Sequence, residues 1–244
     1  SGDKAGFTSC FPPSFEVIKS EVDQESKMQH VVRTNELDVA ARLAELDLTI
    51  EELQEVGRAA YFAKLSCSPL HPPTFGGTSG WAAGVYTLRD QKLSHGWRMR
   101  DPGNFSITIN DPGRLYVVVA TGDQLAGKPF GKAPSTKSPK GFKTEAAVAA
   151  TRQLVLFPDE SYEELKLDAE LVNFRAWFLL LNIEVNSVFV ELSSPAEMIK
   201  GKIVSWSERI IIPALSGEPI HGTGKDDVTG GFSPDIEIDV QRVA

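Results

Sequence analysis

The sequence predicts an α+β protein, in which N-terminal helices and antiparallel β-hairpins form an antiparallel or mixed sheet with helices packed on it. Two patterns support this fold class. Apolar residues recur at helical spacing between residues 35 and 65, whereas residues 105–120 and 175–213 alternate or run continuously apolar, as strands do. Because these patterns occupy separate stretches, we do not expect the elements to alternate as βαβ units.

The first two helices follow from spacing and capping. Apolar side chains recur at helical spacing from Leu37 to Leu48, which predicts a helix with this face buried. Thr49 and Glu52 form a capping box, in which the hydroxyl and the carboxylate each accept a hydrogen bond from a free backbone N–H. A second helix is therefore expected from residue 50 to about residue 65.

A loop and a third helix come next. Residues 68–80 contain three prolines and three glycines, so we expect a loop there. Trp81, Val85 and Leu88 share one helical face, which predicts a third helix that begins near residue 81. Gly96 is well placed to end it.

Residues 105–120 predict a β-hairpin. Phe105, Ile107 and Ile109 alternate with polar residues, which is the pattern of a strand with one face in solvent. Residues 110–113 read Asn-Asp-Pro-Gly and have the chemistry of a turn. The apolar run from residue 115 to residue 120 then predicts a second, more fully buried strand.

The rest of the chain predicts two more helices and several strands. Capping residues predict an Ala-rich helix from Thr144 to about residue 157 and a short acidic helix from Ser161. The remaining expected elements are a pair of strands over 175–195, a helical turn from Ser194 to Gly201, a strand over 202–213 and an edge strand over 236–240.

Composition divides the chain into three parts. Residues 1–34 predict an irregular N-terminal arm, and residues 216–244 a flexible tail rich in Gly and Asp. Residues 35–215 are expected to form one α+β domain, with an optional internal boundary near residue 158.

The overall charge limits the classes of partner. The chain has 244 residues, 41% of them hydrophobic and 24% charged, and its formal net charge is −8. Attraction of the whole surface to nucleic acid or anionic lipid is therefore excluded, and such a contact needs a local basic patch.

The compartment is expected to be the cytoplasm. Cys10 and Cys67 are too few for a disulfide framework and favour a reducing environment. The apolar runs over 115–120 and 177–181 are far shorter than a membrane span. The first ten residues lack the pattern of a signal peptide, so we expect no membrane association.

Residues 122–128 read GDQLAGK, which has the spacing of a phosphate-binding P-loop. A P-loop needs Ser or Thr after its Lys to bind Mg²⁺, and a helix that begins there. Here Pro129 follows, and further glycines and prolines come before any expected helix. The sequence therefore predicts a coincidental match within a loop.

The same loop is unusually basic. Between Gly122 and Lys143 there is one acid, Asp123, against five lysines, which gives a local net charge of +4. These are Lys128, Lys132, Lys137, Lys140 and Lys143. Lysines on a Gly- and Pro-rich loop can follow a phosphate backbone with little demand on geometry. The alternative interpretation is a solvated loop whose charges maintain solubility.

Aromatic residues accompany these cations. Arg98 and Arg100 closely follow Trp97, and Phe130 and Phe142 lie within the loop region. Cations mixed with aromatic rings suit single-stranded nucleic acid, because rings stack on bases.

Three helices before a hairpin are also the element order of a winged helix-turn-helix, with Arg89 and Lys92 on the third helix. The long link between the second and third helices argues against it, because that motif uses a turn of about three to four residues.

Carboxylates are the remaining candidates for catalysis. The four histidines and two cysteines form no metal-binding signature, so we expect no metal and no cofactor. Glu184 and Glu191, on the two arms of the later hairpin, are the best pair for a metal-dependent hydrolase or nuclease. Glu191 follows an apolar run, however, and a buried acid needs a partner such as Arg175 or Arg209.

These observations predict a non-enzymatic protein that binds nucleic acid or another polyphosphate through residues 128–143, assisted by Arg98 and Arg100. The uneven charge also fits a protein-interaction module or self-association. A metal-dependent hydrolase or nuclease built on Glu184 and Glu191 is the third interpretation.

Overall fold

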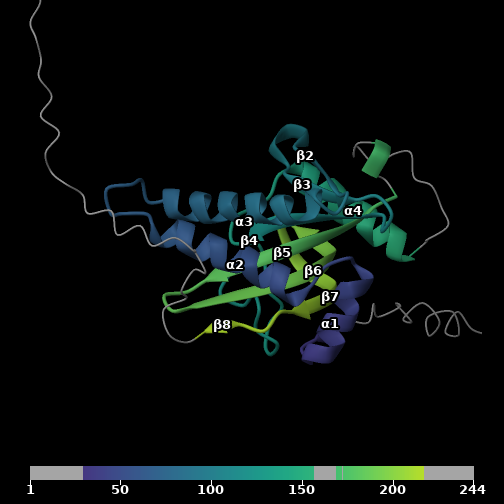
Figure 1. Cartoon of the computed structure of the whole chain (residues 1–244). Coiled ribbons are helices and arrows are strands. Elements are labelled where there is room, and N and C mark those ends of the chain that lie inside the picture. The colour runs from purple at the N-terminus through teal and green to yellow at the C-terminus, as the bar shows by residue number, and fades with distance from the viewer. Residues whose placement is uncertain (1–29, 157–168, 172, 217–244) are drawn as a thin grey trace, which may run out of the picture.

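The computed structural model describes residues 30–156, 169–171 and 173–216 (Figure 1). Three predicted features lie outside these residues: the short acidic helix from Ser161, the boundary near residue 158 and the edge strand over 236–240. The arm is described only from residue 30 and the tail only at residue 216.

Among the described residues, eight strands form one mixed sheet, which confirms the α+β class. The spatial order is β1-β7-β6-β5-β4-β3-β2, and β8 pairs with β6. The strands are β1 (Val31–Arg33), β2 (Arg98–Arg100), β3 (Ile107–Asn110), β4 (Leu115–Thr121), β5 (Arg175–Ile183), β6 (Ser187–Ile199), β7 (Lys202–Ile211) and β8 (Leu215–Ser216).

Helices cover both faces of this sheet. They are α1 (Glu36–Glu45), α2 (Ile50–Leu65), α3 (Phe75–Leu93) and α4 (Phe142–Leu156), with 3₁₀ turns η1 (Pro102–Asn104) and η2 (Ala169–Leu171). Residues of α1, α2 and α3 share one core with Val117 and Leu179 of the central strands. Residues of α4 share the other core with Val118 and Leu180. Successive residues of β4 and β5 therefore enter opposite cores, which explains why both strands are continuously apolar.

The connection between β4 and β5 differs from the prediction. The two strands pair in parallel, and α4 lies between them in the chain. The expectation of a fold without βαβ units is therefore wrong at this place. Parallel neighbours need a long crossover, and the basic loop together with α4 provides it.

Antiparallel pairs account for the two predicted hairpins, β3 with β4 and β5 with β6. β3 is nevertheless buried on both faces, with Thr108 at 2% exposure, because helices lie on each side of the sheet. The helical turn predicted from Ser194 is wrong. Those residues continue β6 as it pairs with β7, and the ladder shifts register around Pro195, which cannot donate a backbone hydrogen bond.

Local signals predicted the positions of α1 and α2 well, although the buried face predicted for α1 is wrong. Asn35 caps α1, and the capping box of Thr49 and Glu52 is present at α2. Leu37, expected in the core, is 82% exposed. The buried face of α1 instead contains Val39 and Leu43, which remove more apolar area from water than alanines do.

α3 begins at Phe75, inside the stretch predicted to be a loop. Its glycines permit close packing. A Cβ on Gly80 would lie 3.0 Å from the carbonyl oxygen of Ala60 on α2, and a Cβ on Gly84 would lie 3.0 Å from Leu181 Cδ1. The glycines therefore act as contact residues within a helix, and tertiary packing overrides their low helix propensity. No helix among the described residues is long and apolar enough to cross a membrane.

Candidate anion-binding pocket

The P-loop-like stretch over 122–128 binds a carboxylate of the protein itself. The backbone N–H of Gly127 donates to Glu191 Oε2 over 2.6 Å. Arg209 donates to both carboxylate oxygens, from Nη2 over 2.7 Å and from Nε over 3.1 Å. The hydroxyl of Ser193 donates to Oε1 over 2.7 Å. Glu191 is 0% exposed, so this segment surrounds an internal anion where a P-loop would hold a nucleotide phosphate.

The backbone of Gly127 explains why this residue is a glycine. Its φ is +75°, and a Cβ there would lie 2.6 Å from Phe189 Cβ. The next helix, α4, begins only at Phe142, so no helix N-terminus follows Lys128 directly. The geometry therefore agrees with a coincidental match to the P-loop spacing.

The carboxylates considered for hydrolysis are engaged in ion pairs. Glu191 is paired with Arg209, one of the two partners that the sequence suggested. Glu184 accepts a hydrogen bond from Lys128 Nζ over 3.0 Å, which lowers its pKa. Within the described ranges, no group of three or more acidic, histidine or cysteine side chains is arranged to hold a metal ion.

Three of the seven predicted binding residues, Lys128, Arg98 and Arg100, have acidic partners. Lys128 pairs with Glu184 and also lies over the ring of Phe189. The pKa of Arg98 is raised, chiefly by its hydrogen bonds to Asp111 at 2.6 and 2.8 Å.

Arg100 pairs with Glu170 over 2.6 Å. Lys132 is exposed in the loop, and Lys143 lies at the start of α4 beside Gly103. The structure therefore does not bring all seven residues to one surface.

The second half of the basic loop is anchored along the end of β4. The carboxylate of Asp123 accepts hydrogen bonds from the N–H groups of Leu125 and Ser135, each over 3.0 Å. The N–H of Lys137 donates to the carbonyl oxygen of Thr121 over 2.9 Å. These bonds fix where Lys137 and its neighbours lie in the loop.

Lys137 and Lys140 meet Lys64, from the last turn of α2, in a pocket of about 650 Å³. The other walls are the first turns of α3 and the carboxyl ends of the parallel strands β4 and β5. Lys64 Nζ donates to the carbonyl oxygen of Ile183 over 2.9 Å, which holds the ammonium group at the strand end. Among the described residues that line this lysine pocket, none is acidic.

The N-terminus of α3 faces the same pocket. Thr74 precedes the helix without making a side-chain cap, and Gly76 and Gly77 of the first turn are lining residues. Helix N-termini present free N–H groups and a partial positive charge. The absence of side chains on these glycines allows a ligand to approach the backbone closely.

Two of the pocket's three lysines have lowered pKa values. The pKa of Lys64 is lowered by burial and by the nearby charge of Lys137, and burial lowers the pKa of Lys140. In the described part of the chain, no carboxylate forms an ion pair with any of the three. An anion in the pocket would oppose both effects, because its charge favours the protonated form of each lysine.

Sequence reasoning missed Lys64 and the helix N-terminus. Lys64 is distant in sequence from the loop, and the early start of α3 was hidden by the prolines that precede it and the glycines of its first turns. The available signal was the Gly-rich stretch just before Trp81, since glycines at a helix start often accompany a bound anion.

The winged-helix arrangement is not supported. Lys92, assigned to the third helix of such a motif, is only 2% exposed. Its Nζ donates to the carbonyl oxygen of Asp47 and to the carboxylate of Glu52, and it lies over the ring of Trp97. Trp97 itself is buried, so neither side chain is placed to contact a ligand.

Comparisons with known proteins identified no relative of this chain. No protein-family model, curated protein sequence or solved structure matches this chain.

Proposed function

We propose that this protein binds a phosphorylated polyanion, nucleic acid or another polyphosphate, in the lysine pocket formed by Lys64, Lys137 and Lys140 at the N-terminus of α3. The observation that carries the proposal is that three lysines and a helix N-terminus without a side-chain cap line one pocket, whose described lining residues include no acid. Of the predicted loop lysines, this keeps Lys137 and Lys140 in the proposed site, and it adds Lys64.

Three physical effects act together on an anion in the lysine pocket. Ammonium groups attract phosphate without a strict geometry, and the α3 N–H groups and dipole add to this attraction. The carboxyl ends of parallel strands are also a common position for ligands in sheets that carry helices on both faces. Because the lysines and the helix N-terminus contact phosphate, we expect salt to weaken binding and little preference among base sequences.

The proposed activity is binding without catalysis. Among the described lining residues there is no carboxylate, histidine or cysteine that would act as a general base or nucleophile. A protein-interaction role and a metal-dependent hydrolase stay predictions, since no contact among the described residues favours either one.

Two triple variants with equal charge test the proposal. One replaces Lys64, Lys137 and Lys140 with Ala, and the other replaces Lys128, Lys132 and Lys143. Binding of inorganic tripolyphosphate is measured by calorimetry at low and high salt, and thermal unfolding checks that each variant folds. We expect the pocket variant to lose binding, because each charge-assisted hydrogen bond contributes about 1.5–3 kcal/mol.

The control variant should bind as the original protein does. Equal losses in the two variants would show that only general charge matters. Unchanged binding in the pocket variant would exclude the pocket as the site.

A further inference from the structure

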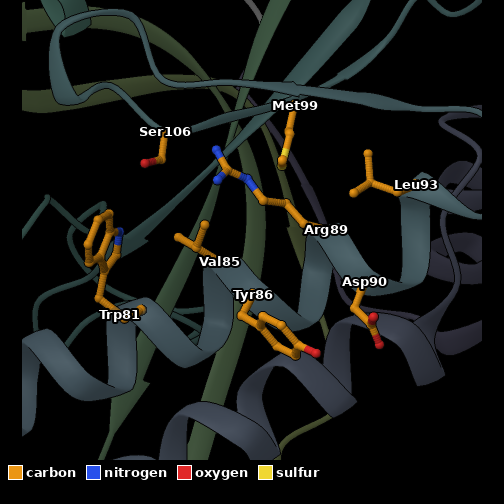
Figure 2. A pocket seen from close by; sticks show the side chains of 9 residues that line it. Trp81, Val85, Tyr86, Arg89, Asp90, Leu93, Met99 and Ser106 are labelled. Carbon is orange, nitrogen blue, oxygen red and sulfur yellow. The ribbon is translucent and has the colours of Figure 1, made fainter.

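A second cavity lies further along α3 and shares one lining residue, Trp81, with the lysine pocket. It has a volume of about 450 Å³ and lies between α3 and the edge strand β2. Figure 2 shows Trp81 at one end and Leu93 at the other, with Tyr86 and Met99 on opposite sides between them. Tyr86 is 69% exposed and Met99 is 51% exposed, so this α3–β2 groove presents apolar and aromatic surface to solvent.

Trp81 joins the two cavities, because it lines both. Its Nε1 donates to the carbonyl oxygen of Val119 over 3.0 Å, which fixes the orientation of the ring. An aromatic ring held in this way loses little conformational freedom when a planar ligand stacks on it.

The charges of the α3–β2 groove differ from those of the lysine pocket. Arg89 crosses it toward Ser106, but its Nη2 is paired with Asp101 over 2.8 Å (Figure 2). Asp90 adds a carboxylate to the lining. The groove therefore has little attraction for phosphate, whereas its rings and its polar side chains suit the planar, hydrogen-bonding part of a ligand.

We propose that the ligand is single-stranded nucleic acid, with a phosphate in the lysine pocket and a neighbouring base against Trp81 and Tyr86 in the α3–β2 groove. This inference rests on the proposed function and specifies its ligand. Each cavity alone has the size of a small-ligand pocket, about 300–1,000 Å³. Two such cavities in sequence along one helix fit a chain of repeating units better than a single compact anion.

Aromatic stacking would also explain how an acidic protein binds a strand of the same charge. Stacking of a base on an aromatic ring changes affinity by about 1–3 kcal/mol, which corresponds to about 5- to 150-fold. Every base has a planar face, so this contact tolerates any sequence. A duplex, whose bases are already stacked on one another, would not use the groove.

The test compares a short single-stranded oligothymidylate with inorganic tripolyphosphate on the full chain. Tyr86→Ala should weaken the oligothymidylate by about 5- to 150-fold and leave tripolyphosphate binding unchanged. Phe130→Ala is the matched control, because Phe130 is an aromatic residue in the basic loop, 89% exposed, and outside the groove. It should change neither affinity.

Tryptophan fluorescence gives a second measurement. Of the four tryptophans, Trp97, Trp177 and Trp206 are at most 4% exposed, which leaves Trp81 to report on stacking. The oligothymidylate should quench emission and tripolyphosphate should not, and Trp81→Phe should remove the quenching. This readout does not depend on whether Tyr86→Ala alters the fold.

The outcomes separate the two proposals. If tripolyphosphate binds through the three lysines but the oligothymidylate neither quenches emission nor responds to Tyr86→Ala, this inference fails and the proposed function stands. Equal binding of a duplex of the same sequence would also overturn it. If neither probe binds at low salt, both proposals fail.

Discussion

The two halves of the basic loop have similar composition and different electrostatic environments. Near Gly127 and Lys128, the loop closes around Glu191, and Lys128 pairs with Glu184. Around Lys137 and Lys140, the loop faces the N-terminus of α3 and a lining without acids. The first half thus binds acidic residues of the protein itself, whereas the second half contributes two lysines to the lining of a pocket.

This difference shows that a local excess of lysines does not identify a binding site. The acid that neutralises Lys128 lies 56 residues away in the sequence, so a count of charges along the loop does not include it. What matters is the balance of charge within a few ångströms, because Coulomb energy depends on distance in space. Three substitutions and one change of pH test the contrast between the two halves.

The largest effect is expected from Glu191→Ala. Arg209 would keep its buried charge without a carboxylate, and the N–H of Gly127 would lose its acceptor. We expect a loss of about 3–5 kcal/mol in the free energy of unfolding. Urea denaturation would measure it, with Glu184→Ala as the control at about 0–1 kcal/mol. Similar values for the two variants would contradict the structural role of Glu191.

The next largest effect is expected from Gly127→Ala. Positive φ costs a residue with Cβ about 1–2 kcal/mol, and the contact with Phe189 adds about 1–3 kcal/mol. Gly131→Ala is the matched control, because its φ is +93° and a Cβ there meets nothing within 4 Å. The two variants' free energies of unfolding, measured in urea, differ by the cost of the contact with Phe189. Equal values would show that the loop moves to relieve this contact without a cost in stability.

A third effect concerns pH and the lysine pocket. The lowered pKa values of Lys64 and Lys140 mean that both lose their protons below the ordinary lysine value of 10.5. Tripolyphosphate binding should weaken as pH rises through this window, by about tenfold or more per lysine. Calorimetry at a series of alkaline pH values would follow this loss of affinity. Affinity that stays constant up to pH 10.5 would contradict the lowered pKa values of the two lysines.

The same shift changes stability in the opposite direction. Between the lowered pKa and 10.5, the unfolded chain binds more protons than the folded one, so each lysine's contribution to stability rises with pH. Lys140→Ala should remove this contribution while it also weakens binding.

The smallest effect is expected from Lys128→Ala. Its partner Glu184 is exposed, and exposed ion pairs contribute about 0–1 kcal/mol. Neither the free energy of unfolding nor tripolyphosphate affinity should change measurably. A clear loss of affinity would extend the binding surface into the first half of the loop.

The fold was largely predictable from local signals, with instructive exceptions. The capping box at Thr49 and the turn after β3 depend on residues close in sequence, so spacing alone located them. The turn expected at Pro195 became part of β6, and the loop before Trp81 became part of α3. In both places, contacts with distant segments outweighed local propensity.

The candidate site was predictable only in part. Lys137 and Lys140 were in the predicted set, but nothing in the sequence separated them from Lys128, and Lys64 was absent from it. Arg98 and Arg100 were included because they lie next to an aromatic residue in the sequence, yet that residue, Trp97, is in the core.

By itself, the sequence determined the fold class, the acidic surface and the concentration of lysines on one loop, because each depends on composition or near-neighbour spacing. The tertiary structure decided which lysines lack an acid and which helix start they face. Ion pairing and desolvation depend on distances between residues far apart in the chain. Only the packing of α2, α3 and the ends of β4 and β5 sets those distances.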